Sequence, residues 1–133
     1  MKKLLLTIDV ICAEGISVRG SSTEVNMVPF TGQAFGESFR GRIIGTGVDT
    51  QKTDLQSGAC SLSARYMLQG MDSEGAPCRI FIENSVRDEA GWHPMLVTDS
   101  RALADWESLP LTASVDGTGR GVVVRIYSDA EER

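Results

Sequence analysis

The sequence predicts a single all-β domain over residues 1–133, built as a sandwich or a barrel. Apolar residues alternate with polar ones along several segments, which is the period of a half-buried strand. Clusters of Gly, Ser, Asp and Pro separate these segments at short intervals, as turns between short strands do. A chain of 133 residues has the length of one domain and can bury a core without disulfides or a structural metal.

Three strands are expected in the first half of the chain. One face of the first strand carries Leu4, Leu6, Ile8, Val10 and Cys12. Similar alternation continues over residues 24–29 and 39–44. The Gly45-Thr46-Gly47 cluster then marks a turn or a bulge, because a phosphate-binding loop would need a helix after it and strands flank this one.

A hairpin is expected from Cys60–Met71 returning through Pro77–Val86. Centring its turn on Glu74 sets apolar residues opposite apolar ones, which a slip of one residue would undo. The resulting pairs are Leu68 with Ile80, Tyr66 with Ile82 and Ala64 with Asn84 on one face, and Arg65 with Glu83 on the other.

Only one segment is predicted to be helical, near residues 100–107. Asp99 or Ser100 can cap this short helix, and Pro110 prevents its continuation. Leu103 and Trp106 then share one side and can plug the end of a barrel. A second hairpin is expected beyond it, joining residues 109–115 to 121–127 through Asp116-Gly117.

The charge balance argues against nucleic acid as a partner. The chain has 13 basic and 18 acidic residues and a net charge of −5, whereas nucleic-acid binders carry a basic surplus. No apolar run approaches the ~18 residues of a membrane span, and Asp9 interrupts the signal-like opening of the chain. We therefore expect a soluble, cytoplasmic protein that binds neither nucleic acid nor membrane.

Cysteine and histidine usage predicts no disulfide, metal or cofactor. The cysteines, Cys12, Cys60 and Cys78, are odd in number and lack CxxC spacing, so reduced, buried thiols are expected. His93 is the single histidine, and one histidine without clustered cysteines or carboxylates does not make a zinc site. A surface histidine beside Pro94 is the expectation, and a general base is the alternative.

Four polar residues are candidates for a binding site. Asn84 falls on the apolar face of the hairpin with Tyr66, where an unpaired amide would cost about 1–3 kcal/mol. It bonds either to the backbone or to a ligand. Asp49 follows the glycine cluster and is expected at the mouth of a barrel. Arg65 either pairs with Glu83 on the outer face or, in another register, points inward and binds an anion.

Several short motifs occur in an order that resembles a known family. They are Val28-Pro29-Phe30-Thr31-Gly32, Phe39-Arg40-Gly41-Arg42-Ile43-Ile44, Gly45-Thr46-Gly47-Val48-Asp49, Leu62-Ser63-Ala64-Arg65-Tyr66, the strand ending in Asn84, Trp106 and Val124-Arg125-Ile126-Tyr127. Together they resemble the bacterial DUF3237 proteins, also called UPF0311. The resemblance implies a small antiparallel β-barrel, calycin- or lipocalin-like. It implies no reaction, because the family as a whole has no assigned activity.

The leading hypothesis is a barrel that binds a small organic molecule in its interior, with Asp49, Arg65, Tyr66 and Asn84 as polar anchors. Two alternatives stay open. One is a cofactor-free enzyme, a lyase, isomerase or hydrolase, in which Asp49 or His93 transfers a proton. The other is an interaction protein that forms a homodimer through the barrel exterior and has a solid core.

Overall fold

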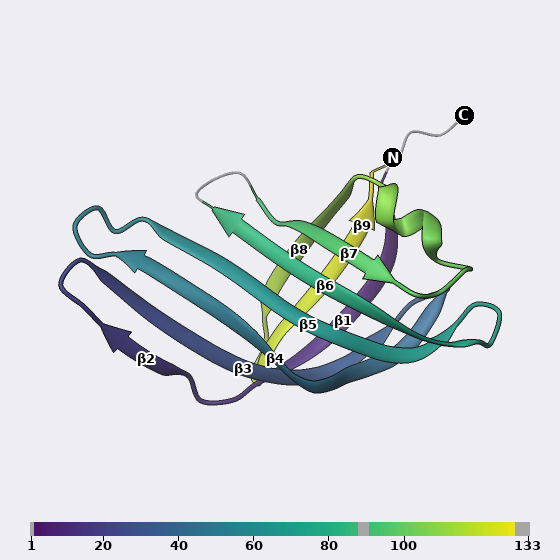
Figure 1. Cartoon of the computed structure of the whole chain (residues 1–133), viewed down its shortest axis with the longest axis horizontal. Helices are drawn as coiled ribbons and strands as arrows, with labels where there is room; N and C mark the ends of the chain where they lie inside the picture. The colour runs from purple at the N-terminus through teal and green to yellow at the C-terminus, as the bar shows by residue number, and fades with distance from the viewer. Residues whose placement is uncertain (1, 88–90, 130–133) are drawn as a thin grey trace.

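One antiparallel sheet curls into a barrel in the computed structural model, which describes residues 2–87 and 91–129 (Figure 1). The all-β prediction is thereby confirmed. The strands are β1 (Lys3–Cys12), β2 (Ile16–Arg19), β3 (Thr23–Phe35), β4 (Phe39–Asp54), β5 (Cys60–Asp72), β6 (Pro77–Arg87), β7 (His93–Thr98), β8 (Leu111–Gly117) and β9 (Gly121–Ser128).

The strands run in the order β7-β6-β5-β4-β3-β1-β9-β8, and β2 pairs with β3 off this path. Each pair of neighbours is antiparallel. The two edge strands of the path approach each other, and a bridge between Trp92 and Ala113 joins them. The curled sheet therefore comes close to closing on itself, which separates an inner face from an outer one.

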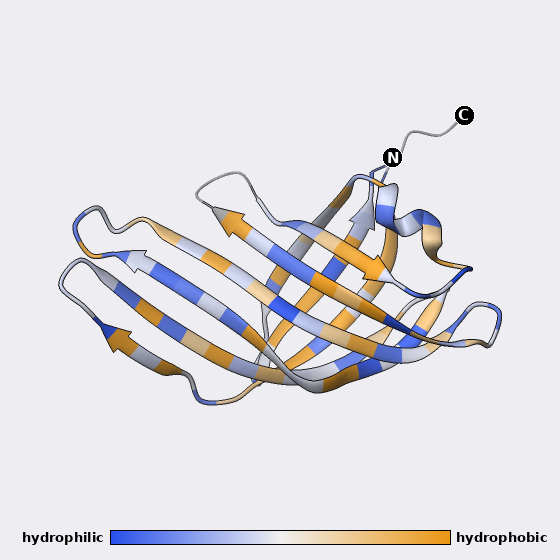
Figure 2. Cartoon of the chain, viewed as in Figure 1, coloured by the Kyte–Doolittle hydropathy of each residue, from blue (hydrophilic) through white to orange (hydrophobic). Residues whose placement is uncertain are grey.

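The register of the first expected hairpin is confirmed; the second hairpin also forms, but Asp116 and Gly117 pair with Val123 and Val122 within its strands, so the turn predicted at these two residues lies at 118–120 instead. In the β5–β6 hairpin Ala64 pairs with Asn84 and Arg65 with Glu83, as the sequence predicts. The β8–β9 hairpin turns between Gly117 and Gly121. Apolar and polar residues alternate along the strands in Figure 2, so consecutive side chains face the interior and the outside in turn.

The first strand departs from simple alternation. Ile8 and Val10 are buried as expected, but Leu4 is 46% exposed and Leu5 is buried instead. The cause is a register shift against β9 between Leu4 and Leu6, which turns the end of the strand over. The face predicted for Leu4 is thus wrong.

One end of the barrel is filled by side chains and covered by the only helical segment of the described residues, η1 (Ala104–Ser108) (Figure 1). The expected short helix is a single 3₁₀ segment that begins at Ala104, four residues later than predicted, so neither Asp99 nor Ser100 is its N-cap. The Trp106 N–H donates to the Leu103 carbonyl at 2.9 Å. Leu103 and Trp106 are both buried and plug this end, as predicted. Within the described ranges no helix has the length and apolar character needed to cross a membrane.

The other end of the barrel is flared. Strands β3, β4 and β5, of 13, 16 and 13 residues, run past the rest of the sheet on the side away from η1, with β2 along their edge (Figure 1). Two of the fully buried core residues, Leu68 and Ile80, pair with each other next to Tyr66 and Ile82. Beyond Tyr66 toward the flared end, the interior becomes a cavity.

Candidate functional site

The interior cavity has a volume of about 270 Å³ and is lined mainly by apolar side chains. These include Val10, Val28, Phe30, Leu62, Val122 and Val124. Polar residues enter the lining from three neighbouring strands, with Asp49 and Gln51 on β4, Tyr66 on β5 and Asn84 on β6. Asp49 is the only charged residue among the described residues that line the cavity.

The predicted turn or bulge at Gly45-Thr46-Gly47 is a β-bulge that sets Asp49 opposite Ala64, on the same inner face as Ile43. The β4–β5 register shifts between Ile44 and Val48, and Gly45 takes a φ of +62°, which favours glycine. Beyond the bulge, Gly47 lies against Phe30, and Phe30 makes an edge-to-face contact with Tyr66 at 5.4 Å between ring centroids. The two rings form the floor beneath the Asp49 side chain.

Three of the predicted site residues surround one small residue. Asp49 and Asn84 lie directly opposite Ala64, from the two strands that flank β5. Tyr66 is two residues along from Ala64 on the same face. Adjacent strands are about 4.8 Å apart, so the methyl group of Ala64 leaves a space about two strand spacings wide between the carboxylate and the amide.

Each of these three residues has an oxygen that is buried and without a hydrogen-bond partner in the described structure. The atoms are Asp49 Oδ1, Tyr66 Oη and Asn84 Oδ1. A buried polar atom left unpaired costs about 1–3 kcal/mol. Burial also raises the pKa of the Tyr66 hydroxyl above its ordinary range, so that this group is neutral at physiological pH. Three unpaired oxygens in one cavity lining point to a ligand that supplies their partners.

The Asp49 carboxylate is held by a short relay of side-chain amides. Gln51 Nε2 donates to Asp49 Oδ2 at 3.0 Å, and Asn26 Nδ2 donates to Gln51 Oε1 at 3.3 Å. This relay fixes one carboxylate oxygen and leaves the other unpaired. Sequence reasoning missed both amides. The available signal was position, since Gln51 follows Asp49 by two residues in a strand and therefore faces the same side.

Cys12 also lines the cavity. Its pKa is raised, first by burial of the thiol and then by the negative charge of Asp49. All three cysteines are free thiols. The expectation of buried thiols holds only for Cys78, because Cys60 is exposed and Cys12 is exposed except for the part of its side chain that faces the cavity.

Arg65 lies on the outer face, apart from the other three candidates. Its Nε donates to Glu83 Oε2 at 2.6 Å, which is the cross-strand pair expected from the register. Both residues and His93 line an outer groove of about 740 Å³. Polar groups in this larger groove pair with one another, as Ser63 and Ser85 do at 3.0 Å. The unpaired oxygens therefore make the interior cavity the better candidate site.

Comparison with known proteins identifies a family and a fold. Residues 3–87 match the family described as "Protein of unknown function (DUF3237)", a span that contains Asp49, Tyr66 and Asn84. No curated protein matches the chain.

Solved structures share the fold at low sequence identity. A protein of unknown function from Clostridium acetobutylicum superposes with a TM-score of 0.77 at 21% identity, covering 96% of this chain and 95% of that one. An enzyme from Penicillium herquei gives 0.76 at 15% identity, covering 96% and 92%. A protein from Acinetobacter baumannii AYE described as "beta-barrel like" gives 0.70 at 17% identity, covering 96% and 94%.

Proposed function

We propose that this chain, which belongs to the DUF3237 family of proteins of unknown function, binds a small organic molecule in its interior cavity. The observation that carries the proposal is the set of unpaired oxygens on Asp49, Tyr66 and Asn84 in an otherwise apolar lining. Small-molecule sites combine apolar walls with a few converging polar groups in this way.

The size of the cavity restricts the ligand. At about 270 Å³ it lies just below the ~300–1,000 Å³ of common ligand pockets, so a compact molecule is expected. An apolar body would cover Val28, Phe30 and Val124, and its polar group would lie near Ala64, between Asp49 and Asn84. A bound molecule of this kind stabilises the folded state in proportion to its concentration.

Binding can be tested with an uncharged fluorophore that carries an N–H donor, N-phenyl-1-naphthylamine, whose emission shifts to shorter wavelength in apolar surroundings. We expect saturable binding at one site per chain. Ala64→Phe fills the space between Asp49 and Asn84 and should abolish the shift. Ser61→Phe places the same ring on the outer face of β5 and should leave the shift unchanged. Full binding by folded Ala64→Phe would refute the interior site.

A second candidate function is that of a cofactor-free enzyme with Asp49 as the proton acceptor. The two oxygens of the Asp49 carboxylate favour this function. Gln51 holds Oδ2 by a hydrogen bond, and Oδ1, the atom that would accept the proton, has no partner among the described residues. One structural neighbour is an enzyme, at 15% identity. Mass spectrometry of a bound ligand after long incubation tests this function. Chemical change with wild-type protein, and none with an Asp49→Asn variant that still binds, would support it.

Homodimer formation stays a prediction from the sequence. Light scattering coupled to size exclusion measures it directly.

A further inference from the structure

We propose that the ligand of the interior cavity is an organic cation, a primary amine with an apolar body. This inference rests on the proposed binding function and names its ligand class. Among the described residues, Asp49 brings the only charge to the cavity lining, and that charge is negative. A carboxylate in apolar surroundings is costly unless a cation or several donors meet it.

The unpaired atoms match the donors of an ammonium group in kind and in number. Asp49 Oδ1, Asn84 Oδ1 and the Tyr66 hydroxyl oxygen can each accept a hydrogen bond. An alkylammonium group has three N–H donors and no acceptor. The three oxygens come from residues around Ala64, on adjacent strands, so one group placed above that methyl is within reach of all three residues.

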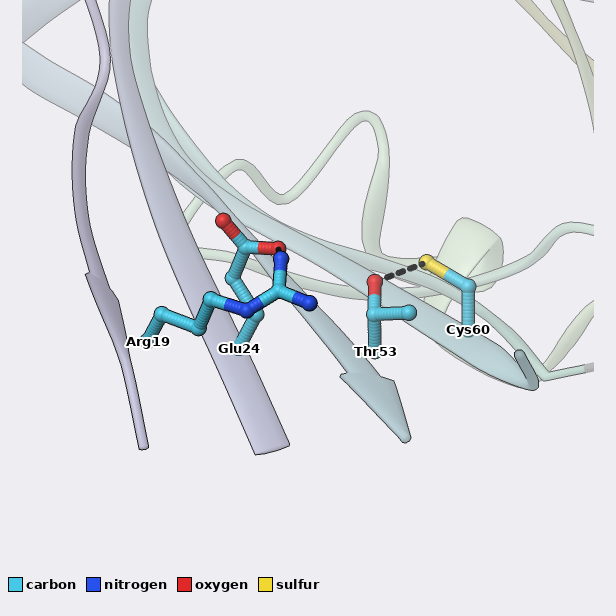
Figure 3. Close-up of polar contacts among 4 residues, drawn as sticks. All are labelled: Arg19, Glu24, Thr53 and Cys60. Carbon is cyan, nitrogen blue, oxygen red and sulfur yellow. Dashed lines mark hydrogen bonds and ion pairs between the residues drawn. The ribbon is translucent and has the colours of Figure 1, made fainter. Parts of the chain in front are cut away.

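In the part of the chain that the structure describes, no ion pair joins a basic side chain to Asp49. Arg19 lies at the rim, where its Nη1 is 3.4 Å from Glu24 Oε1. Figure 3 shows Arg19, Glu24, Thr53 and Cys60 on one face of the sheet, and they are in register across β2, β3, β4 and β5. Thr53 is four residues from Asp49 along β4, or about 13 Å, which separates the rim from the carboxylate.

Arg65 and Lys52 are excluded from the cavity by the alternation of the strands. Both line the outer groove, and Arg65 pairs there with Glu83. The interior carboxylate is thus left for a cation that comes from solution. The net charge of −5 also favours the approach of a positive ligand.

The field of Asp49 already acts on another group in the cavity. It contributes to the raised pKa of Cys12, since a negative charge opposes formation of the thiolate. The same field stabilises a positive charge brought into the cavity. The apolar remainder of the lining favours an organic cation over a metal ion, and no three His, Cys, Asp or Glu side chains gather as metal ligands in the residues described.

The test compares three ligands of nearly equal size that differ in charge: 2-phenylethylamine, 2-phenylethanol and phenylacetate. Calorimetric titration at pH 7 measures their affinities for the wild-type protein and for Asp49→Asn. We expect the amine to bind at least about tenfold more tightly than the alcohol, because charge-assisted hydrogen bonds are stronger than neutral ones. Phenylacetate should not bind, since two carboxylates would meet in the cavity. Asp49→Asn should remove the preference for the amine and leave binding of the alcohol within about threefold.

The outcomes separate this inference from the binding function. If the alcohol binds as tightly as the amine, or the amine keeps its advantage in the folded Asp49→Asn variant, the cationic ligand class is wrong and a neutral ligand takes its place. If N-phenyl-1-naphthylamine binds inside the barrel and none of the three ligands does, the class is equally wrong. If N-phenyl-1-naphthylamine also fails to bind, the proposed function itself is refuted.

Discussion

The ring of Phe30 occupies the space into which a side chain at Gly47 would extend. A Cβ atom at position 47 would lie 2.5 Å from Phe30 Cε1 and 2.9 Å from the Cβ of Tyr66. Gly47 therefore lets the edge-to-face pair of Phe30 and Tyr66 form beneath the cavity. Two glycines of the same bulge thus have different roles, since Gly45 adopts its left-handed φ and Gly47 makes room for the ring pair that lines the cavity.

Gly47→Ala should lower the free energy of unfolding by about 1–3 kcal/mol, because the added methyl forces the two rings apart. Urea denaturation followed by fluorescence measures the change. Gly119→Ala is the matched control, since a Cβ at position 119 meets no atom within 4 Å. Equal effects of the two substitutions would contradict the packing described at Gly47.

At the closed end of the barrel, Ser100 connects the β5–β6 turn to η1. Its buried Oγ donates to Asp72 Oδ2 at 2.7 Å and accepts from the Leu103 N–H at 3.1 Å. Ser100→Ala should destabilise the protein by about 1–3 kcal/mol, because it leaves buried partners unpaired. The exposed Ser73, in the turn itself, is the control, and Ser73→Ala should change urea stability by less than about 0.5 kcal/mol.

Asp72 should make the stability of this end dependent on pH. Its pKa is lowered from 3.8, mainly by the hydrogen bond from Ser100 and also by the N–H groups of Ala76 and Glu74. A lowered pKa means that the carboxylate stabilises the fold above about pH 3.8, and that this contribution is lost as the pH falls through the folded-state pKa. Wild type should have a higher free energy of unfolding than Asp72→Asn at pH 6, and this difference should shrink below pH 4. In a Ser100→Ala background the difference should be lost at higher pH, because the hydrogen bond that lowers the Asp72 pKa most is removed.

The register of the β5–β6 hairpin was predictable because several cross-strand matches agreed on it. Tyr66 opposite Ile82, Arg65 opposite Glu83 and the turn at Gly75 select one alignment. The same register placed Tyr66 and Asn84 on the inner face. Asp49 was suggested only by its position after the glycine cluster. It lies six residues after the buried Ile43 and on the same face, and the bulge sets it opposite Ala64.

The rest of the site depends on irregularities that alternation does not reveal. In β3 the apolar residues Val25 and Met27 lie on one face and Val28 lies on the other, so the sequence does not show which face is buried. In the structure Val28 faces the interior and Met27 is 46% exposed. Asn26 therefore faces the interior, where it bonds Gln51. The register shift in β1 between Leu4 and Leu6 likewise arises from the pairing of β1 with β9. Such features depend on the neighbouring strand, so one strand read alone does not determine them.

Asn84→Leu should leave the stability within about 1 kcal/mol of wild type, because Asn84 Oδ1 has no partner to lose among the described residues. The substitution removes a buried unpaired acceptor and adds apolar volume beside a cavity. Thermal and urea unfolding measure the effect. A loss of about 3 kcal/mol would mean that the amide serves the fold through a bond with the backbone. Binding of 2-phenylethylamine should weaken in the same variant, which ties the amide to the ligand.

The reactivity of Cys12 should report the charge of Asp49. Burial contributes most to the raised pKa of this thiol, and the Asp49 charge contributes less, so Asp49→Asn lowers the pKa only part of the way. In a Cys60→Ser background, alkylation of Cys12 by iodoacetamide at pH 8 should become faster, by less than about tenfold, because the thiolate fraction rises as the pKa falls. Asp9→Asn is the control. Asp9 lies on the face of β1 opposite to that of Cys12, so this substitution should leave the alkylation rate unchanged. An unchanged rate in Asp49→Asn would mean that the carboxylate field does not extend across the cavity, and the case for a cationic ligand would then lack its electrostatic basis.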